Sequence, residues 1–473
     1  MPTAPTGSER ITVRGTDTVR VDLPLEIRGY LRVEESGVVE VTTGSLTFAA
    51  GSTYEHARDG GSIPTATWAE GSTLLMTGTV ENVPANTNQN FYHVVFNTPN
   101  LSKNRDMGWD GVTIGGDIRV VNTGLGRWYL TTAAAGDTSV VTIRGDVIVE
   151  GGAFAVQGTS NALTTFIVHH YGNIRVTGGN FSISRGSQGN GSGTTTWYLY
   201  EGDFSMSNAT TQNSNPTPGN AKFVFAKPGV QKLTLGEGNN IQKLPIEVSS
   251  GTTLDVGTSV LAGNDIFVLR DGATLATAHA DGVAGFLGSL PASMVSLSSA
   301  ANYVFNGSVR QVTSTRMPSV VNDLTINNPA GVVLSQPTTI NGVLHLVAGE
   351  FDNTIPFTLG PNGRVSYEGG TLKVPLAVAG SGTDVPSEFA LLQNYPNPFN
   401  ASTTIRYRLP ANVQVVLKVY DVTGREVSEL VNTKQGPGEF TVSWNASDLP
   451  SGIYYCRITA GNFTAMKKMI LMK

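Results

Sequence analysis

The residues best suited to acid–base chemistry form one short cluster, Arg105-Asp106-Met107-Gly108-Trp109-Asp110. Asp106 and Asp110 supply two carboxylates, and Arg105 supplies a base or a positive charge beside them. Paired carboxylates are the groups that cleave glycosidic bonds. A polar loop has the same composition, and we expect that simpler interpretation, so the chain is not predicted to be an enzyme. The alternative hypothesis is a polysaccharide lyase or hydrolase.

Other motifs for catalysis or metal binding are missing from the sequence. The six histidines show no HExxH or similar metal-ligand spacing, and no GxSxG, P-loop or GxGxxG follows a strand and opens a helix. His169 and His170 are adjacent in a strand-like run, so they point to opposite faces and cannot easily share a metal ion. We therefore expect no organic cofactor.

Several aromatic residues could form a surface on which sugar rings stack. The candidates are Trp109, Trp128, Trp197 and Tyr200. Aromatic side chains in strands also serve as core residues, and both interpretations stay open. Surface glycans are therefore one expected class of partner.

The elements that carry these residues are short strands. Residues 1–380 are rich in Gly, Thr, Ser and Asn and show the two-residue alternation of strands, as in Val38-Val39-Glu40-Val41 and Thr142-Ile143-Arg144. No amphipathic helix is evident in this region. The sequence therefore predicts an all-β fold.

This region also repeats itself. Four segments align: Gly116-Asp117-Ile118-Arg119-Val120, Gly145-Asp146-Val147-Ile148-Val149, Gly172-Asn173-Ile174-Arg175-Val176 and Gly202-Asp203-Phe204-Ser205-Met206. Their glycines are 29, 27 and 30 residues apart. Such a period is typical of a solenoid, in which stacked coils bury one continuous apolar column. We predict a parallel β-helix, right-handed, with roughly 28 residues in a coil and about 13 coils.

The repeated Gly-Asp or Gly-Asn pair is expected at a corner of each coil. Glycine permits the positive φ of a turn, and Asp or Asn can bond the adjacent backbone. Stacking places Asp117, Asp146, Asn173 and Asp203 above one another. A ladder of carboxylates repels itself, and a bound cation would relieve the repulsion. Asp117, Asp146 and Asp203 are therefore candidate calcium ligands, and solvated turn residues are the alternative that we expect.

Composition excludes other classes of protein. Charged residues make up 14% of the chain, against about 25% in an average soluble protein. The net charge of -5 gives no electrostatic basis for binding nucleic acid. No run of about 18 apolar residues predicts a transmembrane helix. The single cysteine, Cys456, excludes an intrachain disulfide and is expected to be a buried apolar residue.

The composition changes near residue 380. Residues 381–386 have the composition of a flexible linker, and residues 385–473 carry a net charge of +3, against -8 for the remainder. Residues 387–473 show turn signals every 8–12 residues between about seven strands, which predicts a small Ig-like β-sandwich. Trp444, Ile453 and Tyr454 are expected to fill its core.

Five motifs of this segment occur in order and end at the chain terminus. They are Asn394-Tyr395-Pro396-Asn397-Pro398-Phe399-Asn400, Thr403-Thr404-Ile405, Val419-Tyr420-Asp421-Val422-Thr423-Gly424-Arg425-Glu426-Val427, Leu449-Pro450-Ser451-Gly452-Ile453-Tyr454 and Lys467-Lys468-Met469-Ile470-Leu471-Met472-Lys473. Together they resemble the type A C-terminal sorting domain of the type IX secretion system. The resemblance implies handling by that secretion machinery and export to the cell surface or the extracellular space.

Two stretches of the repetitive region resemble secreted β-solenoid proteins of the Bacteroidota and related bacteria. The first contains Tyr54-Glu55-His56 and Gly61-Ser62-Ile63-Pro64, and the second contains Asp323-Leu324-Thr325-Ile326 and Gly331-Val332-Val333-Leu334. Residues 1–10 lack the apolar stretch of a signal peptide, which such exported cargo requires. We expect a structural or adhesive surface protein, with self-assembly into a homo-oligomer or filament as a further expectation.

Overall fold

The computed structural model describes residues 10–134, 136–158, 163–185, 193–212, 220–239, 241, 243–261, 263, 266–375, 386 and 388–472. A parallel β-solenoid of about 15 turns covers residues 10–372, and antiparallel sheets follow it. The chain divides into two compact units, residues 1–275 with 285–298, and residues 276–284 with 299–473. The predicted linker, residues 381–386, lies outside the described residues except for Pro386.

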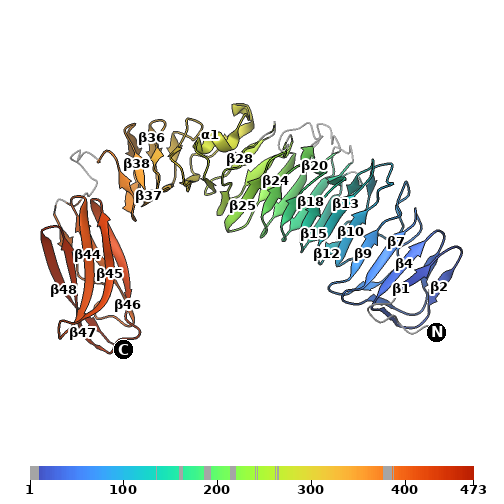
Figure 1. Ribbon diagram of the computed structural model, residues 1–473, viewed down its shortest axis with the longest axis horizontal. Coiled ribbons are helices and arrows are strands. Elements are labelled where there is room, and N and C mark those ends of the chain that lie inside the picture. The colour runs from blue at the N-terminus through green and yellow to red at the C-terminus, as the bar shows by residue number, and fades with distance from the viewer. Residues whose placement is uncertain are drawn as a thin grey trace. The chain divides into compact units, whose positions relative to one another are not determined.

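In the first unit, equivalent strands of successive coils pair in parallel, and Figure 1 shows β4, β7, β9, β10 and β13 as successive rungs. The longest sheet of this unit contains β1 (Arg10–Val13), β4 (Tyr30–Glu34), β7 (Thr53–Ala57), β9 (Thr73–Met76), β10 (His93–Asn97), β13 (Ile118–Asn122), β16 (Val147–Val149), β19 (Ile174–Val176), β22 (Phe204–Met206), β25 (Gly229–Leu235) and β27 (Thr252–Asp255). The predicted parallel solenoid is confirmed.

Two further sheets close the coils in the middle of this unit. One contains β12 (Thr113–Ile114), β15 (Thr138–Ile143), β18 (Thr165–His170), β21 (Thr195–Leu199), β24 (Ala221–Phe225), β26 (Ile246–Val248), β28 (Phe267–Leu269) and β30 (Val295–Leu297). The other contains β11 (Arg105–Asp106), β14 (Trp128–Tyr129), β17 (Ala153–Gln157), β20 (Asn180–Ser184) and β23 (Thr210–Gln212).

The first coils are closed by shorter strands. These are β2 (Thr18–Val21) with β5 (Val38–Val41), and β3 (Leu25–Ile27) with β6 (Leu46–Phe48) and β8 (Thr67–Trp68). The six-residue helix α1 (Gly282–Leu287) and the strand β29 (Thr274–Thr277) lie at the boundary between the units along the chain, and a 3-10 turn, η1 (Ala292–Met294), precedes β30. No helix in the described part of the chain has the length and apolarity that crossing a bilayer requires.

The coils differ in length, which corrects the predicted number of coils. Arg10 pairs with Tyr30, 20 residues further along the chain, whereas Ile118 pairs with Val147, 29 residues further along. The aligned repeats come from the central coils, which are the long ones. Because the shorter coils at the start of the chain were counted at the same length, about 13 coils was too low.

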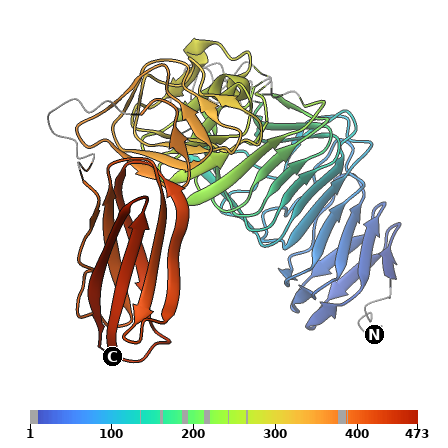
Figure 2. The ribbon, with the colours of Figure 1, turned by 60° about the vertical axis from the view of Figure 1, so that its left-hand side comes forward.

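Inward side chains stack in register and form the core of the solenoid. Trp128 pairs with Phe154, and Phe154 pairs with Phe181, and all three are fully buried. Each such ring covers the ring of the preceding coil, so apolar surface is removed from water along the whole stack. The second view in Figure 2 shows the same stacking of coils.

The second unit contains the last coils and the C-terminal strands. Its coils are built from β31 (Asn302–Phe305), β34 (Leu324–Asn327), β37 (Val343–Ala348) and β40 (Arg364–Tyr367), from β32 (Gln311–Val312), β35 (Val332–Val333), β38 (Glu350–Asp352) and β41 (Thr371–Leu372), and from β33 (Val320–Val321), β36 (Thr338–Ile340) and β39 (Phe357–Leu359).

Two antiparallel sheets form the C-terminal domain. One contains β42 (Ala390–Leu391), β43 (Ser402–Leu409) and β46 (Gly438–Asn445), and the other contains β45 (Glu426–Gln435), β44 (Val413–Asp421), β47 (Gly452–Ala460) and β48 (Phe463–Leu471). Both sheets contribute to one core, in which Trp444, Tyr454 and Cys456 are buried. Ile453 is 36% exposed, so its predicted core position is wrong. Burial also raises the pKa of the Cys456 thiol to about 12.

Candidate functional sites

The predicted corner ladder exists, and it is held together by hydrogen bonds. Asp117 Oδ1 accepts the backbone N–H of Asp146 at 2.8 Å. Asp146 Oδ1 in turn accepts the backbone N–H and the side-chain amide of Asn173 at 2.7 and 3.0 Å. Asn173 Oδ1 accepts the backbone N–H of Asp203 at 3.0 Å. Each side chain therefore reaches the backbone of the next coil.

The ladder replaces the calcium hypothesis with a hydrogen-bonding role. Asp203 Oδ1 accepts the backbone N–H of Lys232 at 2.9 Å, and Asp146 also forms an ion pair with Arg175. Backbone donors and a guanidinium thus offset the repulsion that a cation was expected to relieve. Among the residues that the structure describes, no group of three or more His, Cys, Asp or Glu side chains is placed to hold a metal ion.

The corner glycines serve close packing and do not need a positive φ. A Cβ atom on Gly172 would lie 2.1 Å from the carbonyl oxygen of Gly145, and one on Gly202 would lie 1.9 Å from that of Gly172. Neither glycine is among those with positive φ, whereas Gly152 and Gly179 both have a φ of 70°. The predicted reason for the corner glycines is therefore wrong, because side chains there would penetrate the neighbouring coil.

The candidate catalytic residues engage three different partners. The Arg105 guanidinium donates to the carbonyl oxygens of Glu81 and Asn104. Asp110 is exposed, and its Oδ1 accepts the backbone N–H of Val140 at 3.2 Å. Asp106 is half-buried, and burial raises the pKa of its carboxyl. The polar loop that we expected accounts for Arg105 and Asp110.

Three of the four residues predicted to stack on glycans lie in the core. Trp109, Trp128 and Trp197 are fully buried. The Trp109 indole donates to the carbonyl oxygen of Thr87 at 3.0 Å, and the Trp128 indole donates to Thr98 Oγ1 at 3.0 Å. These three predictions are wrong, since an inward ring in a closed coil cannot meet a ligand in solvent.

The fourth residue, Tyr200, belongs to a surface that the sequence did not reveal. His169, Tyr171, Tyr198 and Tyr200, here called the aromatic patch, are half-exposed and come from neighbouring coils on β18 and β21 or directly after these strands. The four rings lie near-parallel, with centroids 5.2 Å apart for Tyr171 and Tyr200 and 5.8 Å apart for Tyr198 and Tyr200. A hydrogen bond of 2.9 Å joins His169 Nδ1 to the Tyr200 hydroxyl. Spacing of two residues in each strand is the signal that could have revealed this set.

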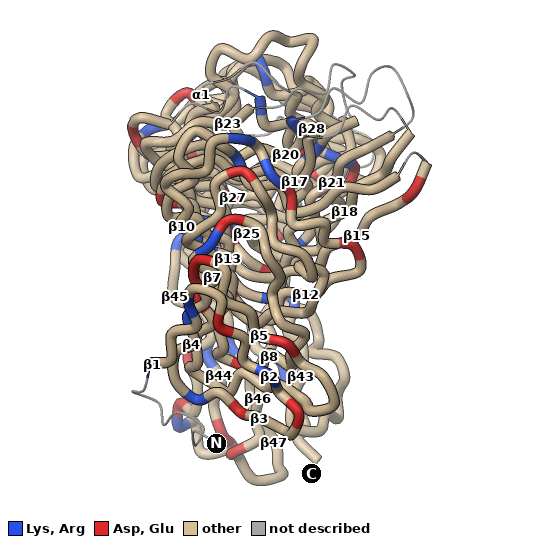
Figure 3. Tube along the Cα trace, turned by 90° about the vertical axis from the view of Figure 1, so that its right-hand side faces the viewer, with Lys and Arg blue, Asp and Glu red and all other residues tan. Residues whose placement is uncertain are grey.

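Charged groups border the aromatic patch. The Arg144 guanidinium lies over the Tyr171 ring, 4.6 Å from its centroid. Two coils beyond Tyr198 in the same register, Glu247 accepts from Lys222 at 3.3 Å and from Arg270 at 2.8 Å. Elsewhere Lys and Arg are interspersed with Asp and Glu, as Figure 3 shows. The patch therefore combines ring faces with donors and acceptors at its border.

The histidine pair divides between the two faces of its strand, as predicted. His169 belongs to the aromatic patch, whereas His170 is fully buried, with Nε2 2.8 Å from the carbonyl oxygen of Gly145. Burial lowers the pKa of His170 to about 4, and it lowers the pKa of the buried His56 to about 4 as well. Both rings are therefore neutral core residues at neutral pH.

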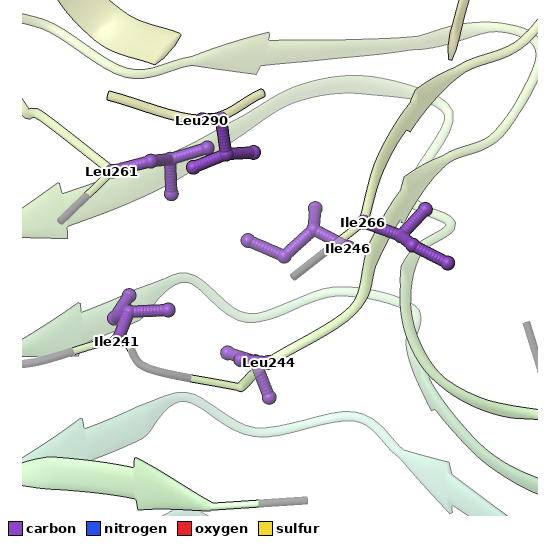
Figure 4. A pocket seen from close by; sticks show the side chains of 6 residues that line it. All are labelled: Ile241, Leu244, Ile246, Leu261, Ile266 and Leu290. Atoms are coloured by element: carbon purple, nitrogen blue, oxygen red, sulfur yellow. The ribbon is translucent and has the colours of Figure 1, made fainter. Parts of the chain in front are cut away.

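An apolar pocket lies among the coils that follow β25. Figure 4 shows its six aliphatic side chains, Ile241, Leu244, Ile246, Leu261, Ile266 and Leu290. None of these side chains can donate a proton or bind a metal. The pocket is therefore a packing gap in the solenoid interior.

In the C-terminal domain, several motif residues form the fold itself. Asn397 Oδ1 accepts the backbone N–H of Ile470 at 2.8 Å, and Asn397 Nδ2 donates to the carbonyl oxygen of Lys468 at 3.2 Å. The buried Asn394 donates to Thr403 Oγ1 at 2.9 Å. Asp421 accepts from the backbone and guanidinium of Arg425 across the Gly424 turn. These motif residues attach the entry segment to the last strand and close a hairpin.

Other motif residues are free to meet a partner. Tyr395 is 76% exposed, and Lys468 and Arg425 are also exposed. Phe399, in contrast, is buried against Trp444, with ring centroids 5.5 Å apart. The motifs therefore contain two kinds of residue, those that stabilise the domain and those that stay accessible.

Comparison with known proteins agrees with this reading of the C-terminal domain. No curated protein and no solved structure matches the chain. One family model matches, the secretion system C-terminal sorting domain, over residues 393–472. The chain is a β-solenoid protein that carries a type IX sorting domain, which implies export to the cell surface or the extracellular space.

Proposed function

We propose that this exported solenoid is an adhesive protein that binds glycans through the aromatic patch. The observation that carries the proposal is the set of near-parallel rings of His169, Tyr198 and Tyr200, which stay accessible while the large indoles of the chain are buried. Sugar rings present C–H groups to aromatic faces and hydroxyls to polar groups. Tyrosine provides both an apolar ring and a hydroxyl, and the ion pairs of Glu247 add donors and acceptors.

The test is binding of the full chain to immobilised polysaccharides. We expect Tyr200→Ala and Tyr198→Ala to weaken binding at least tenfold, about 1.4 kcal/mol. Tyr92→Ala is the matched control, because Tyr92 is a half-exposed tyrosine of another coil. Equal binding by all three variants and the wild type would refute the proposal.

Self-association is a second candidate function, favoured by the first coil. Among the described residues, β1 pairs only with β4, β2 only with β5 and β3 only with β6. Unpaired strand edges are templates for another chain. Electron microscopy and light scattering would then show oligomers or fibres that Ile11→Lys, on β1, removes and Leu125→Lys, at a 94% exposed position, retains. Monomers at every concentration would contradict this function.

A further inference from the structure

We propose that the outward face of β14, β17 and β20 binds the anionic groups of an acidic glycan through Arg127 and Arg185. This site lies on a different sheet from the aromatic patch. The inference rests on the proposed function only in taking the ligand to be a glycan. Its evidence is a half-buried guanidinium that is bound to neutral oxygens.

Strand alternation defines this face. Trp128, Phe154 and Phe181 point into the core, so the residues that alternate with them point away from it. Arg127 and Tyr129 flank Trp128 and therefore share the outward face, on which Asn180 flanks Phe181. Arg127, Tyr129 and Arg185 are half-exposed, so a ligand in solvent can reach them.

Arg127 is held in place by neutral groups. Its Nη1 donates to Asn180 Oδ1 at 2.7 Å and to Ser182 Oγ at 3.1 Å. Ser182 Oγ also donates to Asn180 Oδ1 at 2.7 Å, and both residues are buried. Among the described residues, no carboxylate forms an ion pair with Arg127 or Arg185. A guanidinium has five N–H donors, so Arg127 keeps donors that these two contacts do not use.

The electrostatics of this face favour an anion. Burial lowers the pKa of Arg127 to about 10, and the nearby charge of Arg185 acts in the same direction. Both guanidinium groups still carry a positive charge at neutral pH. Two half-buried like charges destabilise each other, and an anion between them would relieve that repulsion. Residues 159–162, 186–192 and 213–219, which follow the three central strands of this sheet along the chain, contain no Asp or Glu.

Tyr129 makes a sugar acid a better fit than a bare anion. Its ring lies against Gly158, where a Cβ atom would be 2.3 Å from the ring, so the glycine permits this approach. The phenol therefore adds a ring face and a hydroxyl beside the two guanidinium groups. The planar fork of arginine matches carboxylate and sulfate oxygens. The expected ligand is a glycan that carries either group.

The experiment measures retention of the full chain on two matched pairs of polysaccharides at constant ionic strength. Polygalacturonate is compared with its methyl ester, and dextran sulfate with dextran. We expect wild-type binding to at least one charged member to exceed binding to its neutral partner, and Arg127→Gln and Arg185→Gln to weaken it at least tenfold. Arg14→Gln, which removes an exposed charge from the first coil, is the control and is expected to bind as wild type.

The outcomes separate this inference from the proposed function. Binding to neutral polysaccharides that the arginine variants retain, without preference for charge, would overturn the anion site and leave the aromatic patch. Equal losses in all three variants would also overturn it, because they indicate general charge attraction. Loss of binding to every polysaccharide in the wild type would refute the proposed function. Should Arg127→Gln fail to fold, Arg185→Gln decides, because the structure shows no side-chain hydrogen bond of Arg185 within the described chain.

Discussion

Asp117 Oδ1 lies 2.8 Å from the backbone nitrogen of Asp146, the equivalent residue of the next coil. The two carboxylates are thus separated by a donor, and the same contact recurs from Asp146 to Asn173 and from Asn173 to Asp203. Side chains whose spacing suggested a cation ladder instead satisfy the backbone at the corner of each coil. The corner is therefore a place where stability can be tested directly.

Removal of one member of the ladder should destabilise the solenoid. Asp146→Ala leaves the backbone N–H of Asn173 without its acceptor, and we expect a loss of about 1–3 kcal/mol. Asp146→Asn keeps an acceptor oxygen and loses the ion pair with the exposed Arg175, a loss of about 0–1 kcal/mol. Urea denaturation of the two variants measures the difference. Equal midpoints would show that the ladder does not contribute.

Side chains at the corner glycines should destabilise the stack of coils. In Gly172→Ala the new Cβ atom would meet the backbone of Gly145 at 2.1 Å, and we expect a loss of about 1–3 kcal/mol or more. Gly236→Ala is the matched control, because its nearest contact is the Ser207 side chain at 3.2 Å. Thermal melts followed by circular dichroism compare the two. A Gly172→Ala melt at or above that of the control would contradict the packing argument.

Stability should decrease with acid before the carboxylates titrate. His170 is neutral in the fold, with a pKa of about 4, whereas an unfolded histidine has a pKa of about 6.5. Below pH 6.5 the unfolded chain binds more protons, so stability decreases as the pH is lowered from 6.5 towards 4, by up to about 3 kcal/mol for each such residue. Urea midpoints between pH 7 and 5 measure this slope.

Histidine variants identify the source of that slope. His170→Gln keeps a donor for the Gly145 carbonyl and should flatten the pH dependence, whereas His169→Gln, on the exposed face, should leave it unchanged. His56, which is also buried, keeps part of the slope in both variants. An unchanged slope in His170→Gln would contradict the assignment.

The sorting motifs should separate into stabilising and accessible residues. Asn397→Ala removes the contacts to Ile470 and Lys468, so we expect a loss of about 1–3 kcal/mol in the C-terminal domain and reduced export. Tyr395→Ala alters a 76% exposed side chain, so its melting temperature should equal that of the wild type. Export assays with intact cells then show whether the machinery contacts Tyr395. A folding defect in Tyr395→Ala would contradict this division.

The acidic cluster should influence binding without cleaving glycans. We expect the wild type to release no reducing ends from polygalacturonate, and Asp106→Asn to raise retention on it, because the substitution removes a negative charge near Tyr129. Asp110→Asn is the control, since Asp110 caps an exposed backbone N–H. Cleavage that Asp106→Asn abolishes would instead establish the enzyme hypothesis.

The strands and the stacking order were determined by the sequence itself. Alternation in Thr142-Ile143-Arg144 reports a local property of the backbone, and the Gly-Asp repeat places equivalent corners in register without any knowledge of the interior. The C-terminal strands were predicted nearly residue by residue, since β47 and β48 have the predicted bounds. The sorting motifs carry their own turns, so they too can be read locally.

Only the tertiary structure decided which side of each strand faces water. Trp197 and Tyr198 are neighbours in one strand, yet the first is fully buried and the second lies in the aromatic patch. Arg127 and Arg185 are 58 positions apart and meet because two long coils bring their strands onto one face. Coil length changes along the chain, so such juxtapositions follow from the register of stacked coils, which a single strand's pattern does not contain.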